Sequence, residues 1–322
     1  MYLSTLIFSC ADFDFRQLED ESYEIQTAGH LYRVAKNEQI DALFRNILPQ
    51  LTGTVPADQV LSPTDLQILQ SVAPQLMKMG ILFSLDQAHQ GYVEREADRQ
   101  LYTLLARTKE NPLDSFIRLK QLNVHLAGNL AMSRMLQPLL TANSCKVAIE
   151  PEFPLPSIAS MDSASSLVIV SLAHTQKELL SSLNKYFLNH QIRWVPVLFD
   201  PEKITIGPWV WPERSSCLSC MDTHPHHPHI DEPISWDVDL TRTFFKGWTS
   251  CQSNTMHWVA AMLSIQINQA FGSLTKQTPW GRIIEFDCQQ LTQTNKRVWK
   301  HPSCPVCTDN ARQPQLWVEA TR

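Results

Sequence analysis

The sequence predicts an α/β protein with two domains: an N-terminal winged helix-turn-helix unit and a larger, Rossmann-type domain built on a parallel, doubly wound sheet. Three observations carry this prediction. Strand-like and helix-like segments alternate after residue 120, a strand–helix–strand pattern occupies residues 1–86, and two Cys-x-x-Cys pairs lie in the C-terminal half. We place a helical linker at residues 87–120 and the larger domain at residues 121–322.

Length and composition set the outer limits of the interpretation. The chain has 322 residues, of which 43% are hydrophobic and 18% charged, as expected for a globular protein of about two domains. Its net charge of -5 argues against general nucleic-acid binding, because a phosphate backbone selects a basic surface. No stretch is apolar enough for a membrane span, and the N-terminus lacks the basic segment of a secretory signal. We therefore expect a cytoplasmic protein.

Residues 1–86 contain the elements of the winged unit. A hairpin turn is predicted at Ala28-Gly29. The best-defined helix opens at Ser62 and Pro63, which suit the N-cap and the first helical position, and Gly80 stops it. In chain order we expect strands over Leu3–Phe8, Tyr23–Thr27 and Leu31–Ala35, helices over Asp41–Leu51 and Ser62–Met79, and a closing strand over Ile81–Leu85.

The larger domain shows the alternation of strands and helices that predicts a parallel sheet. Its clearest strand is the continuous apolar run Leu167–Leu172, typical of a strand buried on both faces. The expected strands are Leu122–Ala127, Lys146–Ile149, Leu167–Leu172, Trp194–Phe199, Arg282–Asp287 and Arg297–Lys300, and the expected helices are Asn129–Ala142, Glu178–Asn189 and Thr255–Phe271.

Two cysteine pairs, Cys217/Cys220 and Cys304/Cys307, are the sharpest feature of the sequence. A Cys-x-x-Cys turn places two sulfurs on one side of a tight loop, so two such turns supply the four thiolates of a tetrahedral zinc site. The long segment between the pairs means that the metal would join distant parts of one domain. A four-cysteine site leaves no position for water, so the zinc would be structural. A redox pair is the weaker reading, because neither pair visibly follows a strand and opens a helix.

Other metal candidates are less specific. The four histidines of residues 223–229 suit an exposed, proline-stiffened loop better than a second metal site. Replacement of one cysteine ligand by His227 or His301 is a less economical alternative than four cysteine ligands. The remaining cysteines have no local signature of a nucleophile, and we expect them to be small core residues: Cys10, Cys145, Cys251 and Cys288.

The first strand–turn–helix of the larger domain, Val124–Met132, lies where a doubly wound fold would bind a nucleotide. A phosphate turn needs glycines so that backbone N–H groups can approach the pyrophosphate. Only Gly128 is present, and His125 and Met132 are among the residues that fill the rest of the turn. We therefore expect no bound ATP or dinucleotide.

The winged unit is unsuited to DNA, since its presumed recognition helix carries only Lys78 as a cation. A peptide that adds a strand to an exposed sheet edge is the better reading, with a purely structural cap as the alternative. On topology alone, the candidate peptide contacts are Leu31, Tyr32, Arg33, Val34, Gln67 and Gln70.

These pieces resemble one family in the same order. Gly207-Pro-Trp-Val-Trp-Pro212 followed by Cys217-Leu-Ser-Cys-Met-Asp222 resembles the "GP…P…CxxCLD" signature of thiazole/oxazole-modified microcin biosynthesis proteins. Those are the degenerate ThiF-like, or ubiquitin-activating-enzyme-like, components of peptide azoline synthetases. The ending of Val298–Cys307 is similar to the family's closing "hPxCxxC", and residues 41–85 look like its precursor-peptide recognition element.

The resemblance implies a leader-peptide-binding scaffold and activator without its own catalytic residues. Such proteins present the Cys, Ser and Thr residues of a ribosomal precursor peptide to a YcaO-type, ATP-dependent cyclodehydratase. An FMN-dependent dehydrogenase often acts afterwards, and homodimers are common. The YcaO domain is sometimes fused, and here we expect it on a separate chain. The resemblance implies one structural zinc on Cys217, Cys220, Cys304 and Cys307. Two alternatives remain: an ATP-dependent enzyme that adenylates a peptide or carrier-protein carboxylate, and a zinc-bearing transcription regulator.

Overall fold

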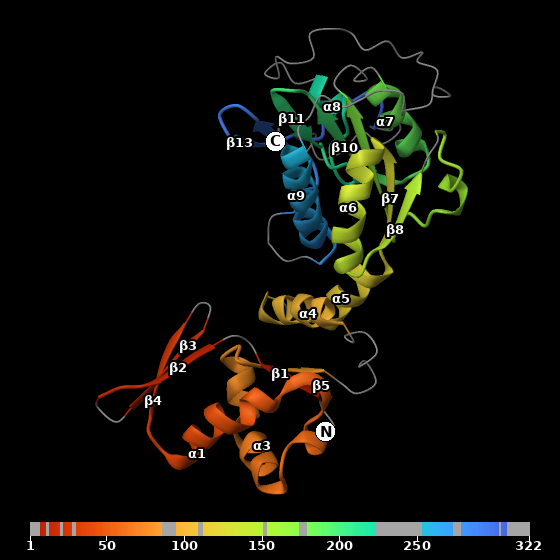
Figure 1. Cartoon of the computed structure of the whole chain (residues 1–322). Coiled ribbons are helices and arrows are strands. Elements are labelled where there is room, and N and C mark those ends of the chain that lie inside the picture. Colours follow the sequence, from red (N-terminus) through yellow and green to blue (C-terminus); the bar gives the residue numbers. More distant parts are fainter. Residues whose placement is uncertain are drawn as a thin grey trace, which may run out of the picture. The chain divides into compact units, whose positions relative to one another are not determined.

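The computed structural model describes residues 7–10, 13–19, 22–27, 30–85, 95–108, 112–150, 153–173, 179–222, 253–272, 278–302 and 304–307. The chain divides into two compact units, Met1–Ile117 and Arg118–Arg322, each of which is described by itself (Figure 1). The predicted turn at residues 28–29, the histidines of residues 224–229, Cys251 and the side chain of Cys10 lie outside the described residues.

Among its described residues, the first unit contains two antiparallel sheets of three strands each. The hairpin strands β3 (Ser22–Thr27) and β4 (Leu31–Ala35) form as predicted, and β2 (Phe13–Gln17) extends them in the order β2-β3-β4. The second sheet has the order β5-β1-β6, from β1 (Ile7–Cys10), β5 (Thr52–Pro56) and β6 (Leu82–Leu85). Of the strand predicted over Leu3–Phe8, residues 7 and 8 belong to β1, and residues 3–6 lie outside the described residues. The strands β2 and β5 were not predicted. Both are five-residue strands, too short for alternation to identify them clearly.

The helical segments between residues 38 and 78 pack against one face of the sheet β2-β3-β4. The predicted helix over residues 41–51 is an unbroken coil of α1 (Glu38–Ala42), a π-helical turn (Leu43–Ile47) and a 3-10 turn (Leu48–Gln50). It begins three residues early because the side chain of Asn37 accepts a hydrogen bond from the Ile40 N–H. Its buried face meets the sheet through Phe44, whose ring stacks on Phe15 at 4.7 Å.

The main helix of this unit, α3 (Pro63–Lys78), is capped as predicted. The Asp65 N–H donates to the Ser62 hydroxyl at 3.2 Å, and Gly80 ends the helix at a φ of 70°. A short helix, α2 (Ala57–Val60), precedes it. The closing strand β6 pairs with β1. The winged helix-turn-helix arrangement itself stays a prediction.

Two further helices, α4 (Glu96–Thr108) and α5 (Pro112–Gln121), lie within or at the end of the predicted linker.

In the described part of the second unit, seven strands form one sheet in the order β13-β12-β11-β10-β9-β7-β8. Four strands are parallel, as predicted: β7 (Asn123–Gly128), β8 (Lys146–Glu150), β9 (Ser166–Ala173) and β10 (Arg193–Phe199). An antiparallel extension follows, made of β11 (Lys203–Ile206), which was not predicted, β12 (Arg282–Asp287) and β13 (Thr292–Arg297).

The strand predicted over Arg297–Lys300 is wrong. The ladder with β12 runs from Thr292 to Arg297, so the strand ends where the prediction began. After it, the Val298 N–H donates to the carbonyl of Gly281 at 2.7 Å, and the chain turns toward the cysteines. The apolar Val298-Trp299 step suggested a strand, but Val298 is buried as part of that turn.

Helices cover both faces of this sheet (Figure 1). The helices α6 (Leu130–Ala142) and α9 (Ser253–Phe271) pack on one face, against alternate strand residues such as Leu167 and Ile169. The helix α7 (Leu179–Asn189) packs on the other face, against Val168 and Val170. Both faces of β9 are therefore apolar, as its continuous run predicts. In the described part of the chain, no helix has the length and apolar character needed to cross a bilayer.

Candidate metal centre and peptide-docking edge

The four predicted cysteines come together on the α7 side of the sheet. Cys217 precedes and Cys220 lies within the four-residue helix α8 (Ser219–Asp222), while Cys304 and Cys307 lie in a turn after β13. Their sulfurs all lie within 4.8 Å of one another. The Sγ–Sγ distance is 3.9 Å between Cys217 and Cys220, 3.7 Å between Cys217 and Cys304, and 3.5 Å between Cys220 and Cys307.

This cluster fits a zinc ion. A Zn–S bond of about 2.3 Å gives a tetrahedron with sulfur–sulfur edges of about 3.8 Å, close to the three distances above. Three of the cysteines are fully buried and Cys307 is partly buried, so four thiolates would enclose the metal and leave no place for water. The donor set and its burial are those of a structural site.

The same distances bear on the redox alternative. The first pair does lie at the start of a helix, contrary to the expectation from sequence, although that helix has only four residues. However, sulfurs of different pairs are closer than the two sulfurs of Cys217 and Cys220. Two independent dithiols would not need sulfurs of different pairs to lie this close, whereas a metal site with four ligands requires it.

Hydrogen bonds hold the segment that carries Cys304 and Cys307 next to the segment that carries Cys217 and Cys220. The Ser216 hydroxyl donates to the carbonyl of Val298 at 2.9 Å, and the His301 N–H donates to the sulfur of Cys220 at 3.4 Å. Hydrogen bonds to its sulfur, first from Cys217 and also from Cys307 and the His301 amide, lower the pKa of Cys220 to about 7. His301 thus supplies a backbone donor to the cluster.

The other described cysteines lie elsewhere. Cys145 is buried, and burial raises the pKa of its thiol to about 12, which keeps it protonated and unreactive. Cys288 is half-buried against the core beside α9. Both match the predicted role of small packing residues.

The predicted peptide contacts on β4 lie along the edge of their sheet. Within the described residues β4 pairs only with β3. The Thr27 N–H donates to His30, so backbone groups at residues 30, 32 and 34 face β3, and those of Leu31 and Ala35 face outward. Tyr32 and Val34 turn their side chains to the core, while Leu31 (61% exposed) and Arg33 are exposed.

Side chains fix this edge to the helices below it. The Tyr32 hydroxyl donates to the carbonyl of Met79 at the end of α3, at 3.4 Å. Gln67 and Gln70 are exposed on α3, and their role in peptide binding stays a prediction. The edge strand and one end of α3 are therefore held together, as strand addition beside a helix would require.

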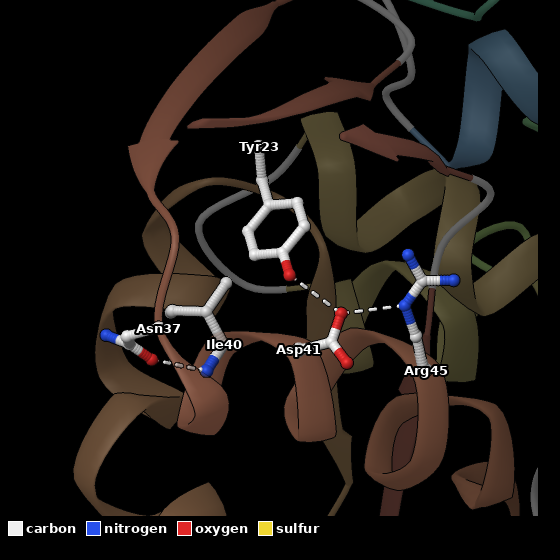
Figure 2. Close-up of polar contacts among 5 residues, drawn as sticks. All are labelled: Tyr23, Asn37, Ile40, Asp41 and Arg45. Carbon is white, nitrogen blue, oxygen red and sulfur yellow. Dashed lines mark hydrogen bonds and ion pairs between the residues drawn. The ribbon is translucent and has the colours of Figure 1, made fainter. Parts of the chain in front are cut away.

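A hydrogen-bonded group formed by the buried Tyr23 and the largely exposed Asp41 and Arg45 anchors the neighbouring strand (Figure 2). The Tyr23 hydroxyl donates to Asp41 Oδ1 at 2.8 Å, and Arg45 Nε donates to the same oxygen at 2.7 Å. Hydrogen bonds from Arg45, and then from Tyr23, lower the pKa of Asp41. No local spacing in the sequence indicates this group, because Tyr23 and Asp41 meet only after the hairpin folds onto α1.

Replacing Asp41 by Asn should lower the stability of the first unit at neutral pH. Because the folded-state pKa of Asp41 is depressed, its contribution is present above the unfolded value near 3.8 and is lost as pH falls through the folded value. The difference in unfolding midpoint between wild type and Asp41→Asn should therefore shrink in acid. A difference that stays constant from pH 7 to pH 3 would contradict this role for the carboxylate.

The turn at which a doubly wound fold would bind a nucleotide packs against β9. Gly128 has a φ of 97°, and a Cβ built there would lie 1.9 Å from the carbonyl oxygen of Ser171 on β9. The Asn129 N–H donates to Ser171, and the Asn129 side chain caps α6 by accepting from the Met132 N–H at 3.0 Å. The glycine thus serves close strand packing, and two of the N–H groups a phosphate would use are already bonded.

A second polar group occupies the end of β8. In dinucleotide-binding folds an acidic residue about 20 positions after the glycine turn binds the ribose. Here Glu150 accepts from Ser157 at 2.6 Å and pairs with His125 Nδ1 at 2.7 Å. Both the His125 and Glu150 side chains are largely buried. His125 lies in the turn indicated by the sequence, but its pairing with Glu150 depends on β7 and β8 lying side by side.

Solved structures share this fold, although no family model and no curated protein matches the sequence. A heterocyclase in complex with substrate and cofactor has a TM-score of 0.63 and 17% identity over 94% of this chain and 39% of its own. The heterocyclase TruD has a TM-score of 0.60 and 17% identity, over 94% of this chain and 43% of TruD. E. coli MccB has a TM-score of 0.55 and 10% identity, over 94% of this chain and 97% of MccB. The chain spans about two fifths of the heterocyclases, and at these identities the likeness establishes the fold.

Proposed function

We propose that this chain is the leader-peptide-binding, zinc-containing component of a peptide azoline synthetase. It would hold the leader of a ribosomal precursor peptide and present its Cys, Ser and Thr residues to a YcaO-type, ATP-dependent cyclodehydratase. The observation that carries the proposal is the likeness of nearly the whole chain to part of a heterocyclase solved with its substrate. The remainder of such a heterocyclase would correspond to the partner.

The docking edge supports the peptide role. The outward backbone groups of β4 can accept an added strand, and its exposed Leu31 offers an apolar contact beside it. E. coli MccB has been solved with its peptide MccA, and this chain matches that fold over 94% of its length. Strand addition is tolerant of sequence, so the main chain would supply affinity and side chains would supply selectivity.

Zinc would supply stability. Cys217 and Cys220 would bind it from the start of α8, and Cys304 and Cys307 from the turn after β13, tying the two ends of the antiparallel extension together. We assign no catalytic residue to the chain. We further propose that it works as a homodimer in the cytoplasm, with an FMN-dependent dehydrogenase acting on the product.

The alternative is an adenylating enzyme. It is favoured by the match to E. coli MccB, which covers 97% of that chain and has been solved with AMPCPP. Against it stand the strand-packed Gly128, the capped start of α6 and the internally bonded Glu150. The isolated chain should therefore show no ATP–pyrophosphate exchange with precursor peptide present, and exchange above a protein-free control would favour the alternative.

Direct binding tests the proposal itself. The fluorescently labelled leader of a precursor peptide encoded beside this chain should bind saturably in an anisotropy titration, with an affinity on the order of micromolar. A scrambled leader of the same composition is the control. Equal signals from both peptides, or no saturation with the partner present, would contradict the proposal.

A further inference from the structure

One face of the sheet β2-β3-β4 carries a row of alternating charge. The side chains of Tyr23 and Ile25 are buried against the helices, so Glu24 between them points to the opposite face. In the sheet, Glu24 lies between Arg16 on β2 and Arg33 on β4. The row therefore reads cation, anion, cation and ends at the edge strand β4.

The inner part of this row is a close ion pair. Arg16 Nε donates to Glu24 Oε1 at 2.6 Å, and Arg16 Nη2 donates to the same oxygen. The Glu24 side chain is only 8% exposed, although it lies on the face away from the core. A carboxylate this buried needs a cationic partner, and opposite charges directly across a sheet stabilise strand pairing. Arg16 fills this role on one side of Glu24.

Arg33 is exposed at the outer end of the row. A strand added to β4 would place one of its residues directly across from Arg33, on the same face. A lysine or arginine there would meet a like charge, whereas an aspartate or glutamate would continue the alternation. An arginine has five N–H donors, so Arg33 can bind a guest carboxylate in addition to contacts within its own chain. The row therefore favours an acidic guest residue at this position.

The neighbours of Arg33 on β4 favour apolar guest residues. Tyr32 and Val34 turn to the core face and are only partly buried, so guest residues across from them would lie at the open edge of the core. Leu31 is 61% exposed on the same face as Arg33 and suits a third apolar residue. Along β4 from Val34 to Leu31, the expected guest residues are apolar, acidic, apolar and apolar. In either strand direction the acidic residue has an apolar neighbour on each side.

The opposite edge of the sheet is less suited to such a peptide. On the outer face of β2, the residue two places from Arg16 is the exposed Asp14. An acidic guest residue across from Arg16 would lie diagonally from this carboxylate, at about 7–8 Å, and the two would repel each other. In addition, two N–H groups of Arg16 already bind Glu24. Charge therefore favours β4 over β2 as the edge that an acidic strand joins.

We propose that Arg33 determines the specificity of the docking edge by binding an acidic leader residue that lies directly across from it. The leader strand then carries an aspartate or glutamate with an apolar residue on each side. This inference rests on the proposed function, because it takes a precursor leader as the guest strand. It adds a selective side-chain contact to main-chain pairing, which accepts many sequences.

A double-mutant cycle tests the contact. Each Asp and Glu of the labelled leader is changed singly to Asn or Gln, and each peptide is titrated against the wild-type chain and against Arg33→Gln. One change should weaken binding to the wild-type chain by about threefold to fivefold and have almost no effect with Arg33→Gln. The residue at that position should have apolar neighbours on both sides. If Arg33→Gln couples equally to every acidic position, or to none, the inference is wrong.

Charge reversal gives a larger effect and has a matched control. A lysine at the same leader position should weaken binding to the wild-type chain by about tenfold, and Arg33→Glu should restore most of the lost affinity. Both effects should shrink as the salt concentration rises. Lys146→Glu changes an exposed residue of β8 and alters the net charge equally, so it should restore nothing. Equal restoration by Lys146→Glu would reveal a general charge effect and overturn the assignment to Arg33.

A second position keeps the test valid if changes at Arg33 prevent folding. Ala35 is exposed on the same face of β4, two residues from Arg33. Ala35→Glu adds a carboxylate diagonal to the acidic guest residue and should weaken leader binding more than the neutral Ala35→Gln does. Equal affinities for these two variants would count against the inference. A leader that fails to bind the wild-type chain contradicts the proposed function too, whereas saturable binding that ignores the charge at both positions overturns this inference alone.

Discussion

Replacing Cys217 or Cys304 with serine should release the metal and lower the melting temperature of the second unit by at least about 10 °C. Structural zinc contributes roughly 10–16 kcal/mol of apparent binding free energy, comparable to or larger than the whole stability of a domain. Losing even about 4 kcal/mol of it would produce a shift of that size in a unit of this length. Elemental analysis and a thermal melt measure both effects.

A matched control separates loss of metal from loss of a thiol. Cys288→Ser alters a half-buried cysteine that lies outside the cluster, so it should keep one zinc per chain and nearly the wild-type melting temperature. A strong chelator should reproduce the effect of Cys217→Ser on the wild-type protein. Native protein without zinc, or a chelator that leaves the melt unchanged, would contradict the assignment of a structural metal.

Replacing Leu31 with proline should weaken leader binding by at least about tenfold. The Leu31 N–H faces outward from β4, so proline removes a donor that an added strand would use and leaves the ladder with β3 in place. The ring also obstructs the approach of a guest strand. Leu31→Ala keeps the N–H and loses only apolar contact, so it should cost less affinity.

The opposite edge of the same sheet provides the control. The Leu18 N–H donates to Ser22, so the groups of Gln17 on β2 face away from β3, as those of Leu31 do on β4. Gln17→Pro should leave leader affinity unchanged. If Gln17→Pro weakens binding and Leu31→Pro does not, the guest strand adds to β2 and the assignment of the docking edge is wrong.

Much of the fold was predictable because its signals are local. The Ser62 cap, the stop at Gly80 and the doubly buried run of β9 each depend on residues close in sequence, and each is confirmed. The cysteine cluster was predictable for another reason. Each pair indicates half of a metal site by its own spacing, and two halves in one chain are rarely coincidental.

What could not be predicted depends on contacts between distant segments. The Tyr23–Asp41 contact forms only when the hairpin folds onto α1, and the Glu150–His125 pair forms only when β7 and β8 lie side by side. The short strand β11 is stabilised by pairing with β12, which lies far along the chain. Strand boundaries such as Arg297 are set by where that pairing stops, not by apolar composition.

The central claim is that this chain presents a leader-bearing precursor peptide for azoline formation. The most direct test is to measure azoline formation in a reconstituted system by mass spectrometry, which detects the loss of one water per ring. The YcaO-type partner, ATP and precursor peptide should form rings slowly alone and much faster when this chain is added. The stimulation should disappear with a precursor that lacks its leader and be reduced by Leu31→Pro. Equal ring formation with and without this chain, or stimulation that ignores the leader, would contradict the account.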